Sequence, residues 1–249
     1  MRSIIAASAV FAALAAAAPA AAITNGTPDG NRHPNVGGLV SLTQFSDGTW
    51  LYCSGTLISP TVFLTAAHCG EDGERVRVTF DTAYQAGDAV HAGTFEADPA
   101  FRKSQSDPHD IAVVVLDSAV GGIAPARLPQ AGSLAGVSGR QRFTAVGYGA
   151  YEVTNGPGGH QYLYDDVRMV ATGTLNALTP SWLRISMNPS TGNGGTCYGD
   201  SGGPNFLGTS DIVAAITITG DAVCRSTNVD YRLDTASARG FLSQHVALP

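Results

Sequence analysis

Charge is scarce in this sequence, and positive charge above all. Only 14% of the 249 residues are Asp, Glu, Lys or Arg, Lys103 is the only lysine, and the net charge is −6. Such a chain has no basic surface to attract nucleic acid or anionic lipid, so we expect neither as a partner. Its residues are 44% hydrophobic, which excludes a disordered chain and predicts a folded protein with a sizeable core.

Long apolar runs are missing except at the N-terminus. Residues 4–18 are apolar and alanine-rich, Arg2 precedes them, and Pro19 is followed by the small residues of a cleavage site. This pattern predicts a signal peptide over residues 1–22 and a mature chain that begins at Ile23. We therefore expect a secreted protein, extracellular or periplasmic, with no membrane contact after the signal is removed.

Cysteine is also rare, with four residues in all. An even number in an exported chain fits an oxidising compartment, and four cysteines can pair in three ways. Their spacing favours two local bridges, Cys53–Cys69 and Cys197–Cys224. Neither pair has Cys-x-x-Cys spacing, which argues against zinc or redox chemistry. The acidic segment 70–74 is typical of a surface turn, so we predict no metal site and no cofactor.

Long helical patterns are absent, whereas glycine is abundant, with 30 residues. Short apolar or alternating runs bounded by turn residues indicate an all-β chain of barrel or sandwich type. Residues 128–140 lack periodicity and are predicted to link two halves. Helical spacing over residues 235–246 predicts one closing helix. The expected strands are 39–43, 51–58, 62–66, 75–80, 111–116, 143–148, 162–171, 183–187, 212–218 and 228–232.

One glycine-rich segment, residues 197–204 with the sequence CYGDSGGP, presents a single hydroxyl, that of Ser201. Glycine allows a positive φ and close approach of another molecule. A nucleophile beside an anion-binding pocket needs both properties. A surface turn is the alternative interpretation, and the partners of Ser201 decide between the two.

Two other segments offer such partners. His68 ends an apolar run beside Cys69, where a disulfide would fix its loop, and histidine is the usual base for a serine nucleophile. Asp110 lies at the start of the buried run 111–116, where an acid is costly without a partner, and it could orient the histidine. Taken alone, Asp110 could equally be a turn residue.

Together these segments resemble the three signatures of the chymotrypsin-like (trypsin-like) serine proteases, in that family's order of His, Asp and Ser. They read TAAHC at 65–69, DIA at 110–112 and GDSGGP at 199–204. The resemblance implies that Ser201 attacks the scissile carbonyl and that His68 transfers the proton.

The same resemblance assigns the supporting roles. Asp110 would orient His68, and the N–H groups of Gly199 and Ser201 would form the oxyanion hole. The implied fold is two six-stranded antiparallel β-barrels with the active site between them and a C-terminal helix. The first barrel would span residues 23–130, the second 140–234, and the helix and tail 235–249.

Activation in this family uses a new N-terminal ammonium, which pairs with the acid before the serine. That acid would be Asp200, and the family's usual Ile-Val-Gly-Gly start corresponds to Ile23-Thr24-Asn25-Gly26. The residue directly before Ile23 is Ala22 and not Arg or Lys. We therefore expect signal cleavage itself to create the active N-terminus.

Specificity follows from the residues that the resemblance assigns to the substrate pocket, which are Gly195, Thr196, Thr217, Thr219 and Val229. Trypsin-like members carry aspartate where this chain has Gly195, which disfavours cleavage after Arg or Lys. Branched side chains at Thr219 and Val229 would make the pocket shallow and favour small aliphatic residues. An alignment slip would instead direct Asp230 into the pocket. Strand alternation argues against that, because Val229 and Tyr231 share one face.

The resemblance thus identifies a secreted serine endopeptidase that acts on polypeptides through an acyl-enzyme, without cofactor and as a monomer. Two other functions are weighed against it. One is a latent protease that needs further processing, which the imperfect N-terminal match allows. The other is a non-catalytic binding protein on the same fold, which the intact triad positions disfavour.

Overall fold

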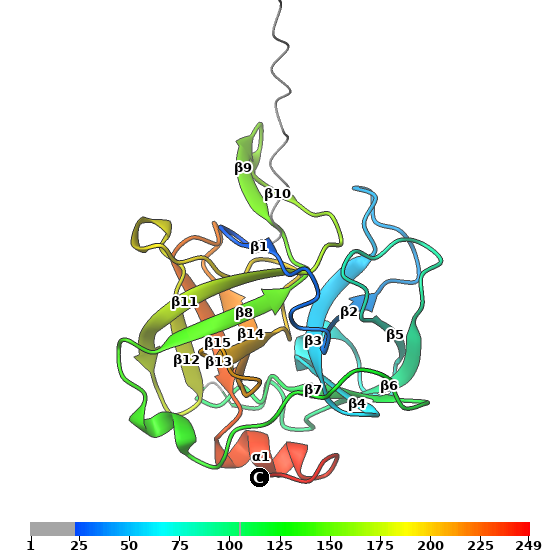
Figure 1. Ribbon diagram of the computed structural model, residues 1–249, viewed down its shortest axis with the longest axis vertical. Coiled ribbons are helices and arrows are strands. Elements are labelled where there is room, and N and C mark those ends of the chain that lie inside the picture. Colours follow the sequence, from blue (N-terminus) through cyan, green and yellow to red (C-terminus); the bar gives the residue numbers. More distant parts are fainter. Residues whose placement is uncertain (1–22, 105) are drawn as a thin grey trace, which may run out of the picture.

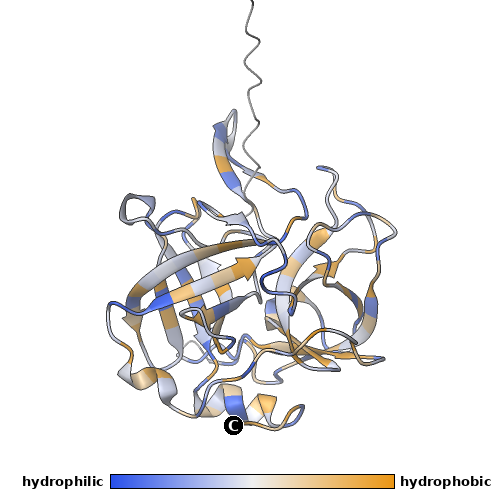
Figure 2. Cartoon of the chain, viewed as in Figure 1, coloured by the Kyte–Doolittle hydropathy of each residue, from blue (hydrophilic) through white to orange (hydrophobic). Residues whose placement is uncertain are grey.

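Two β-barrels lie side by side in the computed structural model, which describes residues 23–104 and 106–249 (Figure 1). The signal peptide predicted over residues 1–22 lies outside the described residues. Hydrophobic and hydrophilic residues are interspersed along the strands, as expected when one strand face packs in a core (Figure 2). No helix among the described residues is both long enough and apolar enough to cross a membrane.

The first barrel closes in the order β2-β3-β4-β7-β6-β5, with antiparallel neighbours throughout. Phe63 and Phe95 are among the side chains that fill it, and neither is exposed. Its strands are β2 (Val36–Val40), β3 (Leu51–Ser59), β4 (Val62–Thr65), β5 (Arg75–Thr79), β6 (His91–Ala97) and β7 (Ala112–Leu116). The alternating run at β5 and the continuous apolar run at β7 both form strands as predicted, whereas β6 was not predicted.

The second barrel closes through the pairing of β8 with β11, and the short strand β1 (Thr27–Pro28) adds to β11 on the outside. Its six strands are β8 (Arg142–Gly147), β11 (Met169–Leu178), β12 (Trp182–Ser186), β13 (Pro204–Leu207), β14 (Val213–Gly220) and β15 (Thr227–Arg232). Two closed six-stranded antiparallel barrels confirm the predicted fold class.

One predicted strand, 162–171, is wrong. The chain forms a hairpin of β9 (Glu152–Gly156) and β10 (Gly159–Leu163), which extends away from the barrels in Figure 1, and β11 begins only at Met169. The break lies at Asp166, which has a φ of +54°. Its carboxylate accepts the N–H groups of Trp50 at 2.7 Å and Leu51 at 3.0 Å, so a contact with the first barrel holds it out of a strand.

Short helices complete the chain. The C-terminal helix α1 (Ala236–Leu242) is shorter than predicted, and Thr235 caps it by accepting the N–H of Ala238. The single-turn 3-10 helices are η1 (Ala67–Cys69), η2 (Ser133–Gly136) in the linker, and η3 (Pro189–Thr191).

Arg168, directly before β11, is wholly buried and joins the N-terminal segment to both barrels. Its Nε lies 3.1 Å from the Asp29 carboxylate, and its Nη2 lies 2.8 Å from Asn31 Oδ1. Its Nη1 donates to the carbonyls of Val36 at 2.8 Å and Phe80 at 3.0 Å. The guanidinium therefore fixes residues 29–36 against β11.

We expect Arg168→Met to lower the free energy of unfolding by about 3–5 kcal/mol, because it removes the buried guanidinium from the Asp29 carboxylate and leaves His33 as its one remaining side-chain partner among the described residues. Denaturant unfolding of the purified protein measures this. The matched control is Arg127→Met, which breaks an exposed pair with Asp211 and should change stability little. Equal effects of the two substitutions on the free energy of unfolding would contradict the stabilising role of Arg168.

Candidate active site

His68 and Asp110 are brought together by the pairing of β4 with β7, in which Thr65 lies opposite Ala112. Asp110 Oδ2 lies 2.8 Å from His68 Nδ1, and Asp110 Oδ1 accepts the His68 backbone N–H at 3.0 Å. Asp110 is only 8% exposed. One carboxylate thus orients both the ring and the backbone of the histidine, and it leaves Nε2 as the ring nitrogen for chemistry.

A disulfide holds the histidine segment to the neighbouring strand. Cys53 in β3 is bonded to Cys69 in η1, with a Cα–Cα distance of 6.2 Å, and the Cys197–Cys224 bridge has a Cα–Cα distance of 5.2 Å. These are the two pairings that the spacing favoured. Cys53, His68 and Cys69 form the one cluster of three potential metal ligands among the described residues. Because both sulfurs are bonded to each other, no thiolate is available for a metal.

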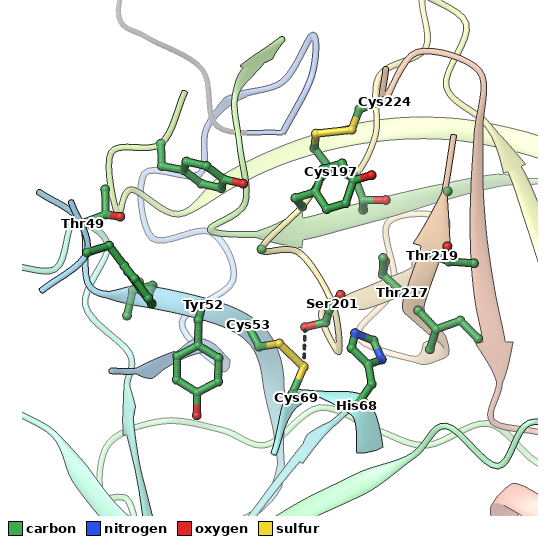
Figure 3. Close-up of a pocket in the computed structure, with 18 of the residues that line it drawn as sticks. Thr49, Tyr52, Cys53, His68, Cys69, Cys197, Ser201, Thr217, Thr219 and Cys224 are labelled. Atoms are coloured by element: carbon green, nitrogen blue, oxygen red, sulfur yellow. Dashed lines mark hydrogen bonds between the residues drawn. A yellow bond between two sulfur atoms is a disulfide. The ribbon is translucent and has the colours of Figure 1, made fainter. Parts of the chain in front are cut away.

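Ser201 and His68 line the same cavity, which has a volume of about 730 Å³. Figure 3 shows Ser201 with the His68 ring on one side and the Cys53–Cys69 disulfide on the other. The Ser201 carbonyl accepts the N–H of Ser54 at 2.8 Å, which joins its loop to the first barrel. The three predicted triad residues therefore lie at one site between the barrels.

Asp200, directly before Ser201, is wholly buried. Its oxygens accept the N–H groups of Gly149 and Cys197, each at 2.8 Å. Burial raises the pKa of this carboxyl to about 7, although the two hydrogen bonds oppose the rise. No ion pair to Asp200 forms within residues 23–104 and 106–249.

The N-terminal residues of the described chain dock into the second barrel. Ile23 is wholly buried and packs with the core cluster of Ala145, Met169 and Ala171. Thr24 pairs with Gly195, whose N–H donates to the Thr24 carbonyl at 3.0 Å. Both residues predicted for activation, Ile23 and Asp200, are thus buried in this half of the molecule.

The cavity includes three of the five predicted pocket residues, which are Thr196, Thr217 and Thr219. Gly195 and Val229 are not part of its lining. Gly195 lies against Met187 and Thr24, and the half-buried Val229 pairs with Thr219 between β14 and β15.

Asp230 lies away from the cavity and is wholly buried in the second barrel. Its Oδ1 accepts hydrogen bonds from Asn205 Nδ2 at 2.9 Å and Thr217 Oγ1 at 3.3 Å. Burial raises the pKa of this carboxyl well above its usual range, despite these bonds. The carboxyl is thus engaged behind Thr217, in the interior.

Several residues of the cavity were missed by the sequence analysis. Tyr198 stacks edge-to-face on Tyr162, with ring centroids 4.6 Å apart, and the Tyr162 hydroxyl donates to the Ala222 carbonyl at 2.7 Å. Tyr164 and Phe45 line the cavity as well. The only sequence signal was the concentration of tyrosines between 148 and 164. Because these residues come from loops and a hairpin, no periodicity marked them.

A family model for trypsin matches residues 30–238. The chain belongs to the trypsin family. This trypsin-family protein is accordingly a serine-type endopeptidase. None of the curated proteins matches it. A solved structure of HL collagenase has the same fold, with a TM-score of 0.66 over 90% of this chain and 95% of that chain. At 19% identity, that similarity concerns the fold of the protease and not its substrate.

Proposed function

We propose that this protease hydrolyses peptide bonds through an acyl-enzyme on Ser201, with His68 as the general base and Asp110 as its orienting acid. The observation that carries the proposal is the 2.8 Å contact of His68 Nδ1 with Asp110, at a cavity that Ser201 also lines. A carboxylate at Nδ1 fixes the tautomer in which Nε2 accepts a proton.

The proposed reaction has two stages, acylation of Ser201 and hydrolysis of the acyl-enzyme. His68 Nε2 takes the proton of the Ser201 hydroxyl as Oγ attacks the scissile carbonyl, and the carbonyl oxygen becomes an oxyanion. The imidazolium returns the proton to the amine as the C–N bond breaks, which leaves the ester of Ser201. Water attacks this ester by the same route and releases the carboxylic acid product.

The N–H groups of Gly199 and Ser201 are proposed to bind the oxyanion. Neither donates a hydrogen bond to another group of the described chain. The Tyr198 carbonyl accepts the N–H of Ala150 at 2.8 Å, and the Gly199 N–H belongs to the same trans peptide. It therefore points away from Ala150. The φ of Gly199 is +94°, which only glycine adopts readily.

Activation is proposed to follow removal of residues 1–22. In the full-length chain Ile23 follows Ala22 and carries a peptide N–H, whereas a chain that begins at Ile23 carries an ammonium. A buried carboxylate such as Asp200 needs a cation. The docked positions of Ile23 and Thr24 support an ion pair between this ammonium and Asp200.

The substrate side chain before the cut is proposed to be small and aliphatic. Thr217 and Thr219 line the cavity with branched side chains, and Val229 pairs with Thr219 across the ladder. Trypsin-like members carry an aspartate where this chain has Gly195, and the Asp230 carboxyl accepts a hydrogen bond from Thr217 in the interior. Neither residue therefore offers a carboxylate to the side chain of an Arg or Lys substrate. We further propose that the protein is exported, since two disulfides suit an oxidising compartment. We also propose that it acts as a monomer.

A fluorophosphonate probe should label the chain that begins at Ile23, because the probe reacts only with an activated serine. Ser201→Ala should abolish the labelling. The control is Ser190→Ala, which changes an exposed serine in η3 and should label like the wild type. Equal labelling of Ser201→Ala would assign the nucleophile to another residue, and no labelling of the wild type would mean that the site is not assembled.

Peptide anilides that vary only in the residue before the cut should be cleaved best with Ala or Val. We expect kcat/KM to be at least about tenfold lower with Arg or Phe, because branched walls exclude longer side chains. Thr219→Gly should raise the relative rate for Phe, because Thr219 lines the cavity. Strong cleavage after Arg with none after Ala would contradict the shallow pocket.

A chain that keeps Ala21 and Ala22 should have a kcat/KM about 10²-fold below that of the chain beginning at Ile23. A buried carboxylate without its partner costs about 3–5 kcal/mol, which disfavours the active arrangement of the Ser201 loop. Asp200→Asn should lower the activity of the shorter chain and leave the extended chain nearly unchanged. Equal activity of the two chains would exclude the ion pair.

The same two chains should also diverge in stability with pH, measured by thermal unfolding in a Ser201→Ala background that prevents self-digestion. Without the ammonium, the folded pKa of Asp200 is raised to about 7, above the unfolded value of about 3.9. The folded state then holds the proton more tightly, so stability falls as the pH rises from about 4 to about 7. The ammonium favours the ionised carboxylate, and the difference in Tm should therefore widen between pH 4 and pH 7.5.

A further inference from the structure

Ser54, in β3, is a wholly buried serine whose three polar groups make four hydrogen bonds. Its N–H donates to the Ser201 carbonyl at 2.8 Å, and its carbonyl accepts the Thr65 hydroxyl at 2.9 Å. Its hydroxyl donates to the Gly199 carbonyl at 3.0 Å and accepts the N–H of Tyr148, also at 3.0 Å. One side chain of the first barrel therefore contacts the nucleophile loop directly.

The two carbonyls that Ser54 binds belong to Gly199 and Ser201, the residues that we assign to the oxyanion hole. A bond to the Gly199 carbonyl fixes the peptide after Gly199, and the bond from Ala150 to Tyr198 fixes the peptide before it. Glycine has no side chain to restrict its φ and ψ, so its conformation depends on such external contacts. The peptide after Gly199 is also held by the Asp200 N–H, which donates to the Cys197 carbonyl at 3.1 Å. Ser54 thus supplies one of three restraints on the two peptides that flank Gly199, and the only one of the three that comes from the first barrel.

Two glycines lie close to the Ser54 side chain. A Cβ at Gly147 would lie 2.9 Å from Ser54 Oγ, and a Cβ at Gly203 would lie 3.1 Å from Ser54 Cβ. The pocket around the hydroxyl is therefore closely packed, and Ser54 itself has no exposed surface. Without the hydroxyl, the Gly199 carbonyl and the Tyr148 N–H would be buried without partners, which favours a shift of the loop.

The Ser54 carbonyl contacts the segment that precedes His68, the proposed general base. Thr65, which donates to the Ser54 carbonyl, ends β4 three residues before His68. The same residue of β3 thus contacts the segment that precedes the base and the loop that carries the nucleophile. This arrangement fixes the two relative to each other across the boundary between the barrels.

We propose that Ser54 is a positioning residue for peptide hydrolysis, whose hydroxyl holds the Gly199 backbone so that the oxyanion donors face the cavity. The proposal rests on the function proposed above for Gly199 and Ser201. Ser54 touches neither substrate nor reacting atoms. Its effect should therefore appear in the stabilisation of the oxyanion and not in the binding of uncharged substrate.

The test compares wild type with Ser54→Ala, using an anilide substrate and a peptide boronate whose adduct with serine mimics the oxyanion. Active-site titration with a fluorophosphonate counts only assembled sites, so partial unfolding does not change kcat per site. We expect kcat to fall about tenfold, less than the 10²–10³ for loss of a whole oxyanion donor. KM should change by less than about twofold, and the boronate should bind weaker by the factor lost in kcat/KM.

Thr144→Val is the matched control, because it removes another buried hydroxyl that donates to a backbone carbonyl, that of Gly208, in the second barrel. It should lower the Tm and leave kcat and boronate affinity unchanged. If Ser54→Ala does not fold, Ser54→Gly removes the same hydroxyl without leaving a Cβ against Gly203.

A Ser54 variant with lowered Tm but wild-type kcat and boronate affinity would overturn the proposal, since the role would then be structural only. A rise in KM alone would overturn it as well. Failure of the proposed function gives a different result, namely a wild type that the fluorophosphonate does not label or a Ser201→Ala variant that retains activity.

Discussion

The hydrogen bond from the Ser54 N–H to the Ser201 carbonyl joins the two barrels at the candidate site. His68 and Asp110 come from the first barrel, and Ser201 comes from the second. A histidine oriented within one barrel is useful only if the serine of the other is held at a fixed distance and angle, because misplacement by 1 Å can cost about 10²-fold in rate. The arrangement therefore depends on contacts that cross between the barrels. This bond is one of them, and it holds the backbone of the nucleophile residue itself.

Burial of charge is the second constraint, and the molecule meets it in three ways. Arg168 and Asp29 are paired with each other. One oxygen of Asp230 accepts hydrogen bonds from the neutral groups of Asn205 and Thr217, its other oxygen is buried without a partner, and its pKa is raised well above the usual range. Asp200 receives two backbone N–H groups and has a pKa of about 7, so it is poised between its charged and neutral forms. Of these three carboxyls, Asp200 is the one whose charge would respond most to a cation beside it.

The sequence predicted the parts of this molecule that depend on local pattern. The runs at β5 and β7 follow the periodicity of a half-buried and a fully buried strand, and the segments around His68, Asp110 and Ser201 carry motifs. The strand β6, with the sequence HAGTFEA, has too few apolar residues to stand out, and the β9–β10 hairpin is mostly exposed. Ser54 and Arg168 were missed because their partners lie far away in the chain. Gly199 is 145 residues from Ser54, and Asp29 is 139 residues from Arg168.

The docking of Thr24 against Gly195 has a consequence for how the protein is made. These residues are 171 positions apart, and Thr24 also donates to the Cys224 carbonyl, 200 positions away, so both contacts close long loops. During synthesis from the N-terminus, the first described residues emerge long before the barrel that receives them. Contacts between residues so far apart in the chain generally form more slowly than local ones. The contact of Thr24 with Gly195 can therefore form only after the segments of the second barrel have been synthesised.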